Sequence, residues 1–146
     1  MKSVETKFLE AGIPYSELDR QIIPLVDVLT FDIGLTTEFS CYGHGDDRGD
    51  KISIVFADGV RDEDVLRFAE FLGSEKGYFV SFDKWHRAFD KDSGLRANWI
   101  MKSTGGWGSE DCPSKTHYFN ELISVCKKYA ELTECPTKKG AEIDGH

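Results

Sequence analysis

The chain has 146 residues, 40% of them hydrophobic and 12% aromatic, and its formal net charge is −8. This composition is typical of one globular domain with a sizeable core and excludes a disordered chain. The acidic balance argues against non-specific nucleic-acid binding, in which lysine and arginine must neutralise phosphates. Neither a membrane-spanning apolar run nor a signal-peptide-like N-terminus is evident. We expect one cytoplasmic domain over 1–146, without membrane contact, with peripheral segments at 1–15 and 133–146.

The N-terminal part is predicted to be helical. A leader or short first helix ends at Gly12 and Pro14. A longer helix follows and stops at Gly34, because apolar side chains recur at helical spacing up to that glycine. Pro24 fits this helix if it lies close to the first turn, where its missing N–H removes little hydrogen bonding. The apolar stripe consists of Leu18, Ile22, Leu25, Val26 and Leu29.

The next segments predict a hairpin. Residues 36–41 are rich in β-forming side chains, and residues 51–56 alternate polar and apolar before they become apolar. We expect these two strands to pair across the loop at 42–50.

The rest of the chain predicts a second helix, two more strands and a last helix. A helix is expected from Asp62 or Glu63 to Gly73, followed by a strand over 77–82. A charged loop separates that strand from another over 96–102. The last helix spans about 113–132, because Pro113 suits a first helical position, and the polar tail after it is predicted to fray.

This order of elements predicts an α+β fold. A four-stranded, mainly antiparallel sheet would carry the helices on one face, as a helix–strand–strand unit that occurs twice, followed by a C-terminal helix. The apolar positions of the helices and strands should then meet in one core. We expect this core to contain Leu25, Leu29, Ile54, Phe56, Phe68, Phe71, Phe82, Ile100, Leu122 and Val125.

The most informative stretch is a turn at the end of the first strand. Residues 36–47 combine a thiol, an imidazole and two carboxylates in a glycine-flanked loop, a mixture from which folding gains little. A nearby imidazolium favours the reactive thiolate, so Cys41 and His44 are candidate catalytic residues. The alternative is that Cys41 ends a buried strand and His44 bonds the loop backbone. The ligand-binding candidates of this turn are Ser40, Gly43 and Asp46.

Metal binding is a weaker hypothesis. Cys41, His44, Cys112 and His117 supply the ligand types of a tetrahedral zinc site. The chain lacks a Cys-x-x-Cys knuckle, so we predict no structural zinc and a fold that persists in excess chelator. The aspartates within 46–50 can in principle hold magnesium or calcium, but the closing glutamate of an EF-hand is missing. The four cysteines are expected to be free thiols.

Two further segments contain tryptophan. In residues 84–87, Trp85 lies beside Arg87 and other cations, a combination that can bind nucleotides or single-stranded nucleic acid. The neighbouring aspartates are also typical of an ordinary hairpin loop. Trp107 lies in a glycine-rich loop that is followed by two acidic residues, which would repel a phosphate. Trp107 is therefore either a ligand-stacking residue or, as we favour, a loop anchor on the core.

One region resembles known proteins. It spans residues 20–56 and contains a helix ending at Gly34, then Thr36-Thr37, Ser40-Cys41-x-Gly43-His44 and the strand Ile52-Ser53-Ile54-Val55-Phe56. This order resembles small proteins of unassigned function in tailed phages and bacteria, and it implies a place in the host cytoplasm. A fainter likeness is to the wybutosine-synthesizing tRNA methyltransferases, which carry a Thr-Ser-Ser-Cys-Ser-Gly-Arg turn after a similar helix. Here His44 replaces the arginine.

These patterns lead to two functional hypotheses. The first is a phage-encoded acidic protein that binds a small anionic or nucleotide-like ligand, or a host protein, near the Cys41–His44 turn. Trp85, Arg87 and Trp107 complete its candidate ligand-binding residues. The second is an enzyme, a transferase or hydrolase acting on a nucleotide or RNA, with His44 as general base and Cys41 or an aspartate assisting. A protein that blocks its partners through an acidic surface is a third class, and the sequence identifies no cofactor.

Overall fold

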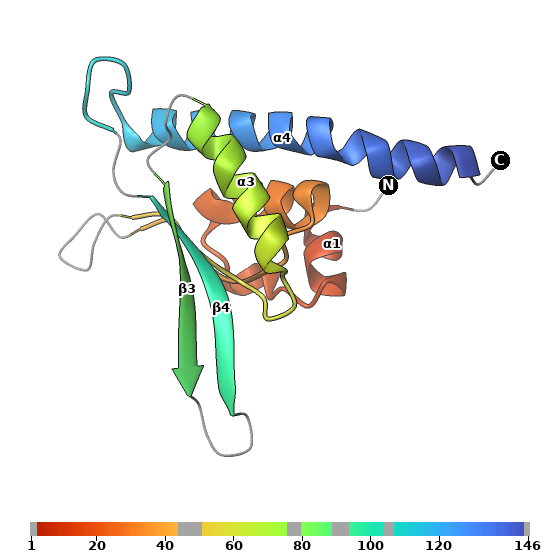
Figure 1. Ribbon diagram of the computed structural model, residues 1–146. Helices are drawn as coiled ribbons and strands as arrows, with labels where there is room; N and C mark the ends of the chain where they lie inside the picture. The colour runs from red at the N-terminus through yellow and green to blue at the C-terminus, as the bar shows by residue number, and fades with distance from the viewer. Residues whose placement is uncertain (1–2, 44–50, 76–79, 89–93, 104–106, 145–146) are drawn as a thin grey trace.

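A computed structural model describes the backbone over residues 3–43, 51–75, 80–88, 94–103 and 107–144, and the side chains of these segments up to residue 133 (Figure 1). None of the helices in these segments combines the length and the apolar character that a bilayer-spanning helix requires.

The N-terminal segment contributes to the core. Helix α1 (Val4–Glu10) begins at Ser3, whose hydroxyl oxygen accepts a hydrogen bond of 3.1 Å from the backbone N–H of Thr6. Phe8 is fully buried and packs edge-on against Tyr15, with ring centroids 5.4 Å apart. The short first helix predicted for this segment is present, and Phe8 makes it part of the core instead of a peripheral leader.

The helix predicted before Gly34 is present as a series of tight and wide turns. The 3-10 turns η1 (Tyr15–Glu17) and η2 (Arg20–Ile22) lead into α2 (Ile23–Asp27) and the π-helical segment η3 (Val28–Ile33). Pro24 lies in the first turn of α2, as expected. Gly34 has a φ of 91°, a left-handed conformation that favours glycine, and it ends the helix there.

The sheet has four antiparallel strands in the order β1-β2-β4-β3. Strands β1 (Thr37–Cys41) and β2 (Ser53–Phe56) form the predicted hairpin, and β4 (Leu95–Ser103) contains the predicted fourth strand. Helix α3 (Asp62–Ser74) follows β2, where a second helix was predicted. The predicted α+β fold is confirmed.

Strand β3 (Val80–Ala88) is longer than predicted. The sequence predicts a charged loop over Lys84–Arg87, whereas these residues continue the strand, and β3 pairs with β4 as far as Ala88 and Leu95. The error has a physical cause: β3 is an edge strand, and charged side chains are common on exposed edges, where they discourage pairing with other chains. Charge alone therefore did not distinguish this strand from a loop.

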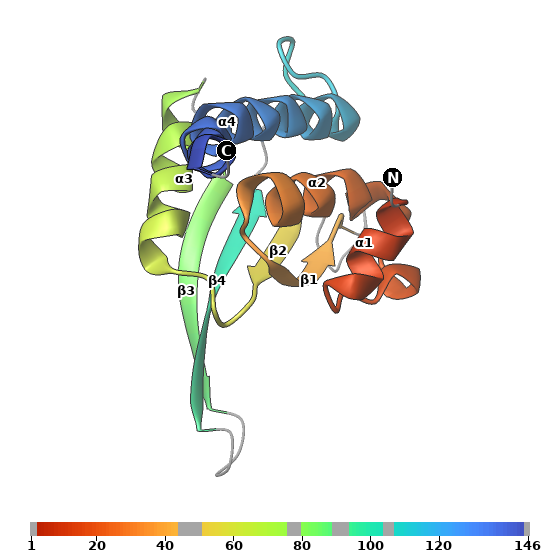
Figure 2. The ribbon, with the colours of Figure 1, turned by 90° about the vertical axis from the view of Figure 1, so that its right-hand side faces the viewer.

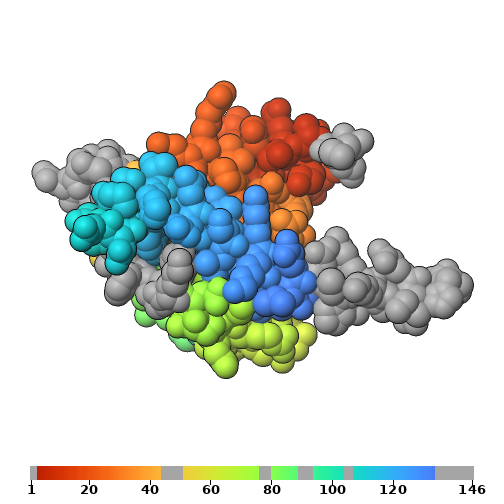
Figure 3. Space-filling view, turned by 90° about the horizontal axis from the view of Figure 1, so that it is seen from above, coloured from red at the N-terminus to blue at the C-terminus, as the bar shows by residue number. Residues whose placement is uncertain are grey.

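All helices lie on one side of the sheet (Figures 1 and 2). Seen from above, α4 (Lys115–Asp144) lies between the N-terminal helices and α3 (Figure 3). Helix α4 is longer than predicted, because its backbone continues to Asp144. That the segment from Thr133 frays stays a prediction. Extension of an existing helix costs far less than its nucleation, so the backbone can stay helical through a segment that contains the poor helix formers Pro136 and Gly140.

The core lies between the sheet and the helices, and most of its predicted members are buried there. Phe71 and Phe82 are partly buried and pack against it. Ile100 is an exception: only 6% of it is exposed, but it lies outside this cluster. Its strand neighbour Met101 belongs to the core, so Ile100 faces the opposite side of the sheet.

Candidate functional site

Successive side chains of a strand point to opposite faces of a sheet, so β2, β3 and β4 each contribute to two different environments. Ile54, Phe82 and Met101 point into the core beneath the helices. Their neighbours Val55 and Ile100 point to the other side, which none of the described helices covers (Figures 1 and 2). We call this side the uncovered face.

The strand register places Cys41 on the uncovered face. Cys41 pairs with Ser53, Ser53 with Lys102, and Lys102 with Ser81, so small polar side chains and one lysine form a row across all four strands. The next row consists of Phe39, Val55, Ile100 and Asp83. This face thus changes from polar to mainly apolar within one step along the strands.

A hollow of about 370 Å³ lies on the uncovered face. Its size is in the range of small-molecule sites. Trp85, at one side of it, is 49% exposed. The residues that line the hollow are Ser53, Val55, Asp83, Lys84, Trp85, Ile100 and Lys102.

The charged groups of the hollow differ in their pairing. The ammonium group of Lys84 lies 2.7 Å from Asp62 at the start of α3, and the indole N–H of Trp99 donates to the same carboxylate over 2.8 Å. These two hydrogen bonds, with that from Lys84 the stronger, lower the pKa of Asp62. Lys102 and Asp83, in contrast, form no ion pair within the described part of the chain.

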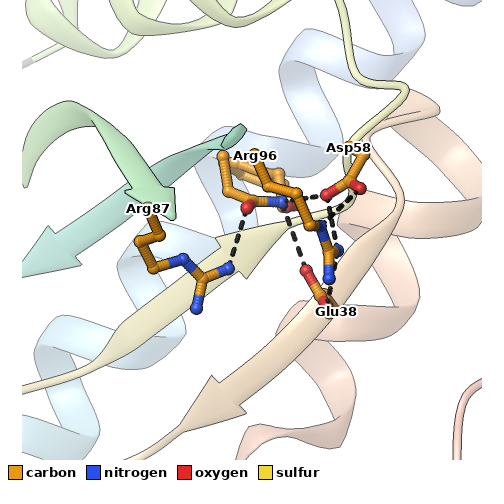
Figure 4. Close-up of polar contacts among 6 residues, drawn as sticks. Glu38, Asp58, Arg87 and Arg96 are labelled. Carbon is orange, nitrogen blue, oxygen red and sulfur yellow. Dashed lines mark hydrogen bonds and ion pairs between the residues drawn. The ribbon is translucent and has the colours of Figure 1, made fainter. Parts of the chain in front are cut away.

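A polar network is centred on Asn98, which pairs with Trp85 of the hollow. Figure 4 shows Glu38, Asp58, Arg87 and Arg96 of this network. Asn98 is only 1% exposed. Its amide nitrogen donates to Asp58 over 2.6 Å, to the carbonyl of Phe56 over 2.9 Å and to Glu38 over 3.2 Å. Its amide oxygen accepts a hydrogen bond of 2.8 Å from Arg87. The single carboxamide therefore connects β1, β3, β4 and the end of β2.

Arg96 completes this network. Its guanidinium binds both carboxylate oxygens of Asp58 over 2.8 Å and reaches Glu38 over 3.2 Å. The hydrogen bond from Arg96, followed by that from Asn98, lowers the pKa of Asp58. Sequence reasoning missed the network because its members come from four separate segments, and only the strand register brings them together.

The network also contacts a predicted ligand residue. The guanidinium carbon of Arg87 lies 4.8 Å from the centroid of the Trp85 ring while the same group is bonded to Asn98. The pairing of Trp85 with Arg87, inferred from sequence, is thus a direct contact, and it fixes one side of the indole.

The structure describes only some of the candidate residues in the turn that follows β1. His44 and Asp46 lie outside the described residues, as do the other aspartates of that loop. Cys41 is half-buried, and its sulfur accepts a hydrogen bond of 3.4 Å from the backbone N–H of Gly43. Ser40 pairs with Ile54 and so points to the helix side, where its hydroxyl is buried without a hydrogen bond among the described residues.

Trp107 is remote from the uncovered face. Its ring packs against Tyr118 of α4, with centroids 5.1 Å apart, and it belongs to the partly buried margin of the core. The ammonium group of Lys115 lies 5.9 Å from the Trp107 ring and 4.1 Å from that of Tyr42. This is the arrangement expected of a loop anchor.

The described members of the hypothetical zinc set do not gather. His117 lies 3.5 Å from Glu121 one turn along α4, and the sulfur of Cys112 lies 3.8 Å from the carbonyl of Ser114. Within the described segments no group of three histidine, cysteine or acidic side chains is placed to hold a metal ion. Because His44 is outside these segments, the absence of zinc stays a prediction, and so does the enzyme hypothesis.

The molecule is therefore a two-layer α+β protein in which Trp85, Asp83 and Lys102 border a hollow on the uncovered face of the sheet. The YoqC prophage protein family matches the chain over residues 6–133, so the chain belongs to that family. Neither a curated protein nor a solved structure matches it significantly. The phage origin implied by the resemblance is confirmed, whereas the likeness to the wybutosine-synthesizing family gains no support.

Proposed function

We propose that this prophage protein is a binding module that holds a nucleotide-like ligand in the hollow of the uncovered face. The observation that carries the proposal is the joint presence, in one hollow, of an exposed indole and an ammonium group without an ion pair in the described part of the chain. The base would stack on Trp85, and the phosphate would approach Lys102.

The chemistry of the hollow suits both parts of such a ligand. Stacking of a base on an aromatic side chain contributes about 1–3 kcal/mol. Arg87 already packs against the Trp85 ring and restrains it, which reduces the entropy lost on binding. Val55 and Ile100 supply an apolar floor between Trp85 and Lys102.

The charge of the whole chain argues for a small ligand. A net charge of −8 repels a long polyanion such as a nucleic acid. A free nucleotide carries few charges, and one lysine beside a stacking surface is enough to orient it. We therefore assign the hollow to a mononucleotide.

Calorimetry with ribonucleoside monophosphates tests the proposal. We expect Trp85→Ala to weaken binding by about 5- to 150-fold, which corresponds to the 1–3 kcal/mol of one stacked base. Lys102→Ala should weaken it as well, whereas Lys127→Ala, which removes an exposed lysine from α4, is the matched control. Failure of the unmodified protein to bind any of these nucleotides at millimolar concentration would contradict the proposal.

A host protein is a second candidate occupant of the same face. Phe39 is 62% exposed there, and it does not line the hollow. Exposed aromatic side chains are enriched at the centres of protein interfaces. Phe39→Ala separates the candidates, because it should weaken capture of a host protein while the affinity for nucleotides stays unchanged.

A further inference from the structure

Asp83 lines the hollow and lies in the middle one of the three rows of side chains that contain Trp85, Asp83 and Lys102. Asp83 and Trp85 are two residues apart on β3 and so point to the same face, about 7 Å apart along the strand. Asp83 pairs with Ile100, one row of side chains away from Lys102. Along the strands, the order of functional groups is therefore indole, carboxylate and ammonium.

This order matches the parts of a nucleotide. With the base on Trp85 and the phosphate near Lys102, the sugar lies over Asp83. An ionised carboxylate only accepts hydrogen bonds, and the neighbouring 2′- and 3′-hydroxyls of ribose can donate one to each of its oxygens. Carboxylates perform this role toward ribose in dinucleotide-binding folds, and the 2′-hydroxyl is the group by which proteins distinguish RNA from DNA.

We infer that the hollow selects ribonucleotides over deoxyribonucleotides and that Asp83 is the residue that reads the sugar. This inference rests on the proposed function, because it assigns the sugar within the same ligand. Asp83 forms no ion pair in the described part of the chain, so its carboxylate is available to a ligand.

The same carboxylate disfavours other occupants. A bare phosphate or sulfate ion beside Lys102 would be repelled by Asp83, since both carry negative charge. A metal ion needs more ligands than this carboxylate, and no group of three suitable side chains exists within the described segments. A ligand with donor hydroxyls next to an anionic group satisfies both charges of the hollow.

The test compares AMP with 2′-deoxy-AMP by calorimetry on the full chain. We expect AMP to bind roughly tenfold more tightly or better, because a hydrogen bond to a charged group is lost with the 2′-hydroxyl. Asp83→Asn should reduce this ratio to less than about threefold by the same reasoning. The affinity for 2′-deoxy-AMP should change less than that for AMP, because the weaker bond to the 3′-hydroxyl and the removed repulsion of the phosphate oppose each other. Asp111→Asn, at an exposed aspartate before α4, should keep the full ratio.

The outcomes separate the two proposals. Equal binding of AMP and 2′-deoxy-AMP by the unmodified protein overturns the assignment of Asp83 and leaves the nucleotide module intact. Binding of neither overturns the proposed function and this inference together. A single-stranded ribo-oligonucleotide should bind no more tightly than AMP, and a much tighter complex would overturn the assignment to a free nucleotide. Competition by inorganic phosphate at the same concentration as AMP would contradict the role of the carboxylate.

Discussion

The two faces of this sheet are made from neighbouring residues of the same strands, but they have opposite character. Ile54, on the helix side of β2, is fully buried, whereas the next residue, Val55, borders an open hollow. On β4 the core residue Met101 lies beside Lys102, which is exposed. A shift of one residue in register would exchange these environments completely.

The comparison shows how one sheet can separate stability from binding. The covered face buries apolar surface, which is the main favourable term in folding. The uncovered face is free to carry groups that a core could not accept, such as Asp83 and Lys102 in one hollow. Antiparallel sheets commonly have one packed and one solvated face, so the sheet can be stable although its second face is exposed to water.

The largest expected effect lies on the covered face. We predict that Ile54→Ala lowers the free energy of unfolding by about 2–5 kcal/mol. The substitution leaves a cavity in the core, and the neighbouring side chains cannot move enough to fill it. Urea denaturation followed by circular dichroism measures this loss. A change below about 1 kcal/mol would show that the helices do not pack tightly on the sheet.

Asn98 should give the next largest effect, although it lies on the uncovered side. We predict that Asn98→Ala costs about 1–3 kcal/mol, because Asn98 is only 1% exposed and its loss removes a buried hydrogen bond to the carbonyl of Phe56 and a partly buried one from Arg87. Asn98→Asp is the matched variant. It cannot donate to Glu38 or Asp58, so it should be at least as destabilising at neutral pH. A neutral effect of Asn98→Asp would mean that the amide donors are not needed.

Val55→Ala completes the comparison of the two faces. We predict a loss of less than about 1 kcal/mol, because Val55 lines an open hollow instead of a closed core. The same urea titration applies, and Ile54→Ala is its paired reference on the adjacent position. Equal losses for the two variants would contradict the division of the sheet into a stabilising and a solvated face.

The smallest effect concerns acid stability. Hydrogen bonds from Arg96 and then Asn98 lower the pKa of Asp58 below its ordinary value of 3.8. The folded state therefore holds this carboxylate ionised at pH values where the unfolded chain already binds a proton. The stabilising contribution is complete above pH 3.8 and is lost as the pH falls through the folded-state pKa.

We predict that Asp58→Asn is less stable than the unmodified protein at neutral pH but loses stability less steeply below about pH 4. Thermal unfolding midpoints in a pH series measure both slopes. Asp58→Asn should still lose some stability as the pH falls, because the pKa of Asp62 is also lowered in the folded state and has an effect of the same sign. Parallel profiles for the two proteins would show that Asp58 does not contribute to acid sensitivity.

The sequence by itself determined the types of the elements and several of their ends. Helical and alternating patterns depend on near neighbours along the chain, so the helix before Gly34, the β1–β2 hairpin and α3 could be predicted from residue order. The same reasoning identified most of the core, and it drew attention to Cys41 beside His44 and to Trp85 beside Arg87, because each pair combines residue types that are typical of binding sites.

Only the tertiary structure decided which of these residues meet. The strand order β1-β2-β4-β3 and its register join Cys41, Ser53 and Lys102 in one row, and they collect the Asn98 network from four segments. Strand order and register also turned Ile100 away from the helices. Pairing between distant strands is governed by burial of the whole sheet against the helices, which no local pattern records, and it was this pairing that created the hollow.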